Sequence, residues 1–112
     1  MSQKQLTTTP EMDTPKIEPS YRLPDIITLQ HALKLAILED KPIMMDYWTD
    51  SLIKKVLIGV KEDGEKLLVK NENEYTSSIS RLLKAGSNEY IIVTENSIYI
   101  VDSAIPVKRI SS

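Results

Sequence analysis

Several kinds of residue are missing or scarce in this chain of 112 residues. It has no cysteine, which excludes disulfides, thiolate metal sites and a cysteine nucleophile. It has one histidine, one tryptophan and no phenylalanine, and its three glycines cannot form a glycine-rich phosphate loop. No apolar run reaches the ~18 residues that cross a membrane, and the N-terminal residues lack the apolar core of a secretory signal. These absences favour an intracellular protein, or one held inside a larger particle, that is not secreted.

The residues that are present suffice for one small domain. Apolar residues make up 41% of the sequence, and 14 basic side chains stand against 16 acidic ones. The resulting net charge of −2 gives no general attraction to nucleic acid or to anionic lipid. No phosphate-loop, zinc-site or nucleophile motif is present. We therefore expect no enzyme activity, no cofactor and no metal, and we do not favour nucleic acid as the partner.

Residues 1–20 differ in composition from the rest of the chain. They contain three prolines and four threonines but few large apolar side chains. Such a segment buries too little surface to offset its ordering entropy, so we expect an extended arm followed by a domain of residues 21–112. The arm is either a frayed terminus or a peptide that becomes ordered on a partner. In the second case, the apolar anchors on the partner are Leu6, Met12, Ile17 and Tyr21.

One amphipathic helix is predicted before the β-rich part of the chain. Thr28 is placed to cap a helix that begins at Leu29, and Pro42 ends it at about Asp40. Apolar residues at helical spacing place one stripe against the core. That stripe consists of Leu29, Ala32, Leu33, Ala36 and Ile37.

From Ile43 onward the apolar period changes to two, which predicts strands. The expected strands cover residues 43–48, 52–61, 66–70, 89–94, 97–102 and 105–110. Asp63-Gly64 predicts a two-residue hairpin, and Gly59 indicates a bulge or a close approach to the backbone. Residues 78–85 are expected to form one or two helical turns that end at Gly86. The predicted fold is α+β, mainly β with one N-terminal helix, as a small SH3-like or Sm-like, partly open antiparallel barrel.

The polar side chains form no recognisable catalytic or metal-binding motif. His31 has no neighbouring group that would make it a general base or a metal ligand. Asp46 and Asp50 flank Trp48, but carboxylates at such positions more often accept hydrogen bonds in a turn.

The aromatic and lysine residues at 47–55 offer a further candidate site. Tyr47 and Trp48 belong either to the core or a protein interface, or to a nucleic-acid patch with Lys54 and Lys55. Acidic residues nearby cancel most of the charge of such a patch.

The order of elements resembles that of the Sm-like barrels. “PIMMDYW” is followed by “LIKKVLIGV”, a hairpin, later strands and a closing “IPVKRI”, and over residues 29–110 this topology is similar to the WYL domain. The resemblance implies a small barrel. It does not imply ligand binding, because the WYL signature triplet and the arginine-rich binding pattern are absent.

In style the chain is also similar to small virion proteins of large DNA viruses. The similarity is carried by the Thr/Pro-rich arm, by a body rich in Ile, Lys and Asn, and by “TENSIYIV”. It implies a minor capsid or cement role in which the arm threads between larger capsid subunits.

The sequence supports two hypotheses. The first is a non-enzymatic structural or interaction protein of a larger assembly, whose arm becomes ordered on a protein partner and whose Trp48 makes a second contact. The alternative is a small barrel that binds nucleic acid or a small ligand through Tyr47, Trp48, Lys54 and Lys55. The sequence does not predict the oligomeric state.

Overall fold

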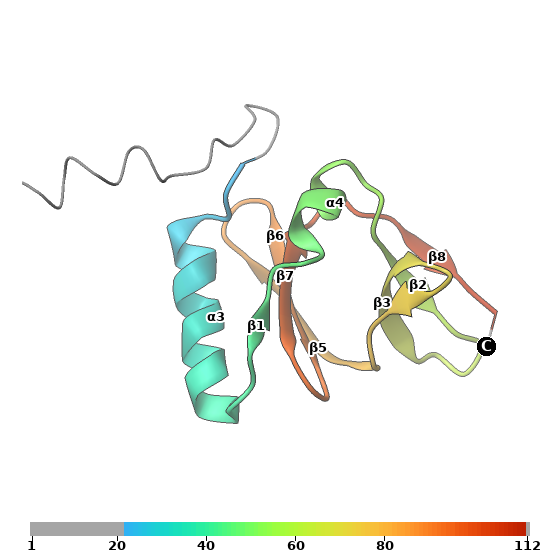
Figure 1. The fold of residues 1–112 in the computed structure, drawn as a ribbon, viewed down its shortest axis with the longest axis horizontal. Coiled ribbons are helices and arrows are strands. Elements are labelled where there is room, and N and C mark those ends of the chain that lie inside the picture. Colours follow the sequence, from blue (N-terminus) through green and yellow to red (C-terminus); the bar gives the residue numbers. More distant parts are fainter. Residues whose placement is uncertain (1–21, 112) are drawn as a thin grey trace, which may run out of the picture.

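The computed structural model describes residues 22–111 and shows three stacked layers (Figure 1). The helix α3 forms the first layer, sheet A the second and sheet B the third. The helical elements are α3 (Ile26–Glu39) and α4 (Trp48–Leu52). The strands are β1 (Ile43–Met44), β2 (Leu57–Val60), β3 (Lys66–Asn71), β4 (Glu74–Tyr75), β5 (Ile79–Ala85), β6 (Glu89–Thr94), β7 (Ile98–Asp102) and β8 (Val107–Arg109).

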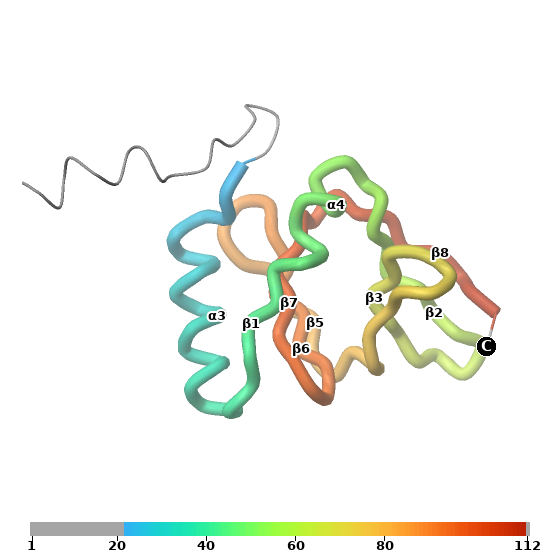
Figure 2. Tube along the Cα trace, viewed as in Figure 1, coloured from blue at the N-terminus to red at the C-terminus, as the bar shows by residue number. Residues whose placement is uncertain are grey.

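Each sheet has four strands, in the order β1-β7-β6-β5 for sheet A and β4-β3-β2-β8 for sheet B. Figure 2 shows the chain leaving sheet A after β1, building β2 to β4 in sheet B, returning for β5 to β7 and ending beside β2. The prediction of a mainly β fold with one N-terminal helix is confirmed. The SH3-like or Sm-like, partly open barrel is not confirmed, because the strands form two separate sheets. The expectation that all strands pair antiparallel is wrong, because β1–β7 and β2–β8 are parallel pairs. These parallel pairs arise because the chain crosses between the two sheets.

Two hydrophobic cores separate the layers. The first lies between α3 and sheet A and contains Ala32, Trp48, Ala85, Ile91, Val93, Ile98 and Ile100. The second lies between the sheets and contains Tyr47, Val56, Ile58, Leu68, Ile92, Val101 and Ile105. Alternate residues of β6 and β7 therefore supply both cores. This double burial explains why these strands are almost continuously apolar in the sequence.

The helix α3 begins three residues earlier than predicted. Its N-cap is Asp25, whereas Thr28 lies inside the first turn and is buried. The Thr28 hydroxyl donates to the carboxylate of Glu89 on sheet A, so a tertiary contact takes the side chain expected to form the cap. The C-terminal end agrees with the prediction, because Asp40 follows the last helical residue with φ 55°.

The face of α3 that packs on sheet A also differs from the predicted stripe. Ala32 is fully buried, and Leu29, Leu35 and Ala36 pack around the same core. Leu33 and Ile37, expected in the core, are 55% and 79% exposed. Both sides of this helix are apolar, so periodicity alone could not show which side packs on the sheet.

The segment expected to form the first two strands has fewer extended residues than predicted, and it contains a helical turn. Only Ile43–Met44 of the expected strand 43–48 is extended, and Trp48–Leu52 is helical. The next strand starts at Leu57 rather than at residue 52, after a turn in which Lys54 has φ 60°. The turn is needed because the chain leaves sheet A here and enters sheet B.

Residues 78–85 were expected to contain helical turns, but Ile79–Ala85 is the strand β5. It pairs with β6 along almost its whole length, and these long-range hydrogen bonds outweigh the local helical preference. A hairpin at Asp63-Gly64 is confirmed, with Gly64 at φ 91°, but its loop is longer than the two residues expected, because residues 61–65 lie between the paired Val60 and Lys66. The strands β6, β7 and β8 lie within the predicted ranges, and β8 is an edge strand of sheet B.

Candidate functional site

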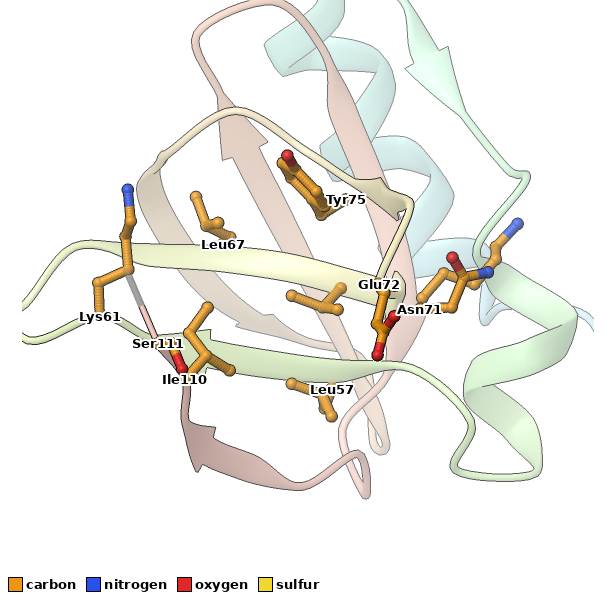
Figure 3. A pocket seen from close by; sticks show the side chains of 10 residues that line it. Leu57, Lys61, Leu67, Asn71, Glu72, Tyr75, Ile110 and Ser111 are labelled. Carbon is orange, nitrogen blue, oxygen red and sulfur yellow. The ribbon is translucent and has the colours of Figure 1, made fainter.

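The outer face of sheet B carries an apolar pocket of about 560 Å³, here called the sheet-B groove (Figure 3). Its floor is formed by Leu57, Leu67 and Val69 on the two central strands. Figure 3 shows Tyr75 standing on one side of this floor and Ile110 on the other. The outer face of an antiparallel sheet is usually polar, so an apolar outer face indicates a surface that binds something.

Strand alternation and register place the floor residues side by side. Ile58 and Leu68 point into the core between the sheets, so their neighbours along each strand point outward. Leu57 is opposite Val69, and Leu67 is opposite Gly59. The outward side chains therefore form one continuous apolar strip across β2 and β3.

Gly59 makes room for one wall of the groove. A Cβ at this position would lie 2.7 Å from Cδ1 of Ile110, so the isoleucine occupies the space that another residue type would fill. Ile110 is held there because its N–H donates to the carbonyl oxygen of Val60 at 3.0 Å. The close approach to the backbone predicted at Gly59 is thus confirmed.

The opposite wall, Tyr75, is 59% exposed and sits on the short edge strand β4. The register between β3 and β4 shifts between Val69 and Asn71, and such a bulge re-aims the side chains beside it. The next residue, Thr76, fixes this strand, because its N–H donates to the carbonyl oxygen of Leu68 at 2.9 Å. Its hydroxyl oxygen also accepts from the Leu68 N–H at 3.1 Å.

Charges at the rim of the groove are mixed and largely paired. The ammonium group of Lys61 lies 3.3 Å from the carboxylate of Glu65, and that of Lys70 lies 3.6 Å from Glu74. A hydrogen bond from Ser78, together with Lys61, lowers the pKa of the Glu65 carboxyl. Glu72 adds a further negative charge to the rim. The rim therefore has little net attraction for a polyanion or for an isolated charge.

Tyr47 and Trp48, chosen from the sequence as contact residues, are each only 4% exposed. The Trp48 indole donates to the carbonyl oxygen of Arg22 at 2.8 Å and packs in the core below α3. Tyr47 lies in the other core, edge-on to Tyr99 with 5.3 Å between ring centroids. Although adjacent in sequence, the two rings lie in different cores and share no open face. Both aromatic side chains therefore fill a core and do not form an exposed contact surface.

The remaining residues singled out from the sequence do not converge on a site. Lys54 and Lys55 are both exposed, without an open aromatic face from Tyr47 or Trp48 beside them. His31 is exposed on α3, and within residues 22–111 no group of three or more metal-ligating side chains occurs. The arm anchors lie outside the described residues, and their role stays a prediction: Leu6, Met12, Ile17 and Tyr21.

The groove residues were not predicted, although the sequence contains a signal for them. In “VLIGV” and “LLV”, the positions on both faces of the strands are apolar, with no polar alternation. One face of such strands fills the core and the other requires a second apolar environment.

A buried polar network at one end of sheet A was also missed. Glu89 is fully buried, and its carboxylate accepts hydrogen bonds from Arg22 and from Thr28. Arg22 also lies 2.9 Å from the carboxylate of Asp102. This network attaches the chain entering α3 to the ends of β6 and β7, and it contacts no pocket described above. We interpret it as structural.

Comparisons with protein-family models, with curated proteins and with solved structures gave no match. Among residues 22–111, no helix is both long enough and apolar enough to cross a membrane.

Proposed function

We propose that this chain is a non-enzymatic interaction protein that binds an extended apolar segment of a protein partner in the sheet-B groove. The observation that carries the proposal is the apolar outer face of sheet B, bounded by Tyr75 and Ile110. Leu57, Leu67 and Val69 form a floor that no other described element covers. An apolar partner side chain placed there would remove this floor from water.

An extended peptide suits this site better than a compact charged ligand. The floor crosses β2 and β3, and the sheet ends on either side in short edge strands, β4 and β8. Edge strands offer backbone hydrogen-bonding groups to an added segment, while pockets on the sheet face select its side chains. The paired charges at the rim provide no convergent set of donors for a phosphate or a metal.

We further propose that the partner belongs to a larger assembly, in the manner of a minor capsid or cement protein. This part rests on the resemblance in style to small virion proteins and on the Thr/Pro-rich residues 1–20. The arm then provides a second contact through Leu6, Met12, Ile17 and Tyr21, in addition to the groove.

Peptide display on the full-length protein tests the groove. Random dodecapeptides would be selected on the wild type and their affinities compared with those for Tyr75→Ser and Leu67→Ser. Each groove variant should weaken the selected peptides at least about tenfold, which corresponds to about 1.4 kcal/mol. Leu82→Ser is the matched control, because Leu82 is a 37% exposed leucine on β5 of the other sheet. Selected peptides whose affinity is indifferent to both groove variants would overturn the proposal.

The alternative is an Sm-like or SH3-like domain that binds nucleic acid through Lys54 and Lys55. The observation that favours it is that both lysines are exposed and adjacent. It predicts binding of a labelled single-stranded oligonucleotide that weakens with salt and is abolished by the double change Lys54→Glu, Lys55→Glu. Oligonucleotide binding that is absent, or that survives this change, excludes the alternative.

A further inference from the structure

The face of α3 that points away from sheet A is apolar. Ile26, Leu33 and Ile37 form one row along this face and are 71%, 55% and 79% exposed. Ile27 and Leu38, at the two ends of the neighbouring row, are 56% and 79% exposed. The helix therefore has one apolar side in the core and a second apolar side in water. A helix that is apolar all round is normally buried all round.

The size of this surface points to a protein interface. Leu23, just before the helix, is 65% exposed and extends the apolar surface of the helix by one more side chain. If each of the six side chains offers on the order of 100 Å² of apolar surface, together they offer roughly 600 Å². This total lies at the upper end of the largest apolar patch on a typical monomer, which is often functional. It is below the about 800 Å² that each partner contributes to a standard protein interface, so it suits a small helix-to-helix contact.

The spacing within the row points to a helix as the occupant. Ile26, Gln30, Leu33 and Ile37 follow one another at intervals of four, three and four residues. This is the spacing of a seam at which the side chains of one helix insert between those of another. Gln30 is the one polar member of the row, and a single polar residue at such a seam fixes the register.

We propose that the occupant is α3 of a second copy, packed antiparallel across a two-fold axis. In that register Ile26 of each copy lies opposite Ile37 of the other, and Leu33 lies opposite Gln30, so the row is complementary to itself. Antiparallel packing also places the positive end of each helix dipole beside the negative end of its partner. His31 and Lys34 share the neighbouring row with Ile27 and Leu38, at the edge of the seam, where the imidazole and the ammonium group keep access to water.

The dimer leaves the groove proposed above accessible. The helix and sheet B lie on opposite sides of sheet A (Figure 1), so pairing through α3 covers neither groove. A dimer would present two grooves to an assembly and gain avidity for a partner that repeats its binding segment. The dimer proposal does not depend on the groove binding anything.

Sedimentation of the full-length protein over a range of concentrations tests the oligomeric state. The wild type should shift from monomer to dimer, and Ile37→Glu or Leu33→Glu should leave only monomer. Leu82→Glu, on β5, is the matched control and should dimerise like the wild type. A wild type that stays monomeric at every attainable concentration overturns the proposal. If Ile37→Glu then lowers the melting temperature of this monomer, a segment of the same chain covers the face instead.

Introduced cysteines test the antiparallel register, and the absence of native cysteine makes each result unambiguous. Under mild oxidation, an equal mixture of Ile26→Cys and Ile37→Cys proteins should form the mixed disulfide dimer. Each protein alone should form a disulfide dimer at least about tenfold more slowly. Faster self-coupling of Ile26→Cys would indicate parallel helices, and a dimer with no mixed disulfide would place the interface elsewhere. Either outcome overturns the proposal.

Discussion

Sheet A and sheet B have equal numbers of strands but different surroundings. Sheet A is covered by α3 on one face and by sheet B on the other, and β6 and β7 are buried almost throughout. Sheet B is covered on one face, and the residues of β3 are mostly half-exposed or exposed. The difference indicates a division of roles, in which sheet A holds the fold together and the outer face of sheet B is free to bind.

The largest expected effect concerns sheet A, which is covered on both faces. Ile100→Ala, at a fully buried position of β7, should lower the free energy of unfolding by about 2–5 kcal/mol, because it leaves a cavity in the core below α3. Leu67→Ala, on the floor of the sheet-B groove, should cost about 1 kcal/mol or less. Urea unfolding of both variants measures the difference. Equal losses would contradict the proposed division of roles.

The next expected effect compares two arginines, Arg22 before α3 and Arg81 on β5, that differ in the burial of their carboxylate partners. Arg22→Ala would leave the fully buried Glu89 carboxylate without its cation and should cost about 2–3 kcal/mol. Arg81→Ala removes an ion pair with Glu39 whose side chains are 47% and 26% exposed, and should cost about 0–1 kcal/mol. Thermal and urea unfolding measure both. Adding Glu89→Gln to Arg22→Ala should recover part of the loss, and no recovery would argue against a charge effect.

A smaller expected effect compares two glycines with positive φ, one in a turn of each sheet. Gly86, between β5 and β6, has φ 58°, and a Cβ there would lie 2.6 Å from side-chain oxygens of Asp25, Glu89 and Thr28. Gly64, in the sheet-B hairpin, has φ 91° and nothing within 4 Å of such a Cβ. Gly86→Ala should therefore cost about 2 kcal/mol and Gly64→Ala about 1 kcal/mol, as measured by urea unfolding. Equal costs would mean that backbone conformation alone matters at both turns.

Local sequence patterns were sufficient where an element depends on its own residues. The strand Glu89–Thr94 and the hairpin at Asp63-Gly64 were placed correctly, because an apolar run and a turn dipeptide carry the signal locally. The strand Ile79–Ala85 was missed, because its pairing with β6 decides its conformation. The parallel pairing of β1 with β7 and of β8 with β2 joins strands that are distant in sequence, which a local pattern cannot show.

The candidate site was less predictable than the fold. Trp48 and Tyr47 were chosen because aromatic residues are common at interfaces, but their rings fill two separate cores. The groove depends on which of two apolar faces points outward, and that choice is made only when sheet A covers one face of sheet B. The same ambiguity misassigned Leu33 and Ile37 on α3. In both places the sequence holds more apolar residues than one core can bury. This excess was the signal for the sheet-B groove and for the exposed face of α3.

The smallest expected effect concerns the boundary between the two sheets and appears only at alkaline pH. Burial between the sheets, with Tyr99 and the carboxylates of Glu74 and Asp46 contributing, raises the pKa of Tyr47 from 10.0 to about 12. The folded state therefore favours the neutral phenol more than the unfolded state does. This contribution to stability is fully present below pH 10 and is lost as the pH rises through about 12.

Tyr47→Phe removes the titrating group while keeping most of the packing. The variant should lose less stability than the wild type between pH 10 and pH 12. This is the interval between the pKa of Tyr47 in the unfolded state and its pKa in the folded state. Urea unfolding at several alkaline pH values measures the two slopes. Tyr75→Phe, which alters an exposed phenol of sheet B, is the matched control and should follow the wild-type slope. A slope for Tyr47→Phe equal to that of the wild type would mean that water reaches the boundary between the sheets. The contact between the sheets would then be open to solvent at Tyr47, and coverage by sheet B would no longer explain the stability assigned to sheet A.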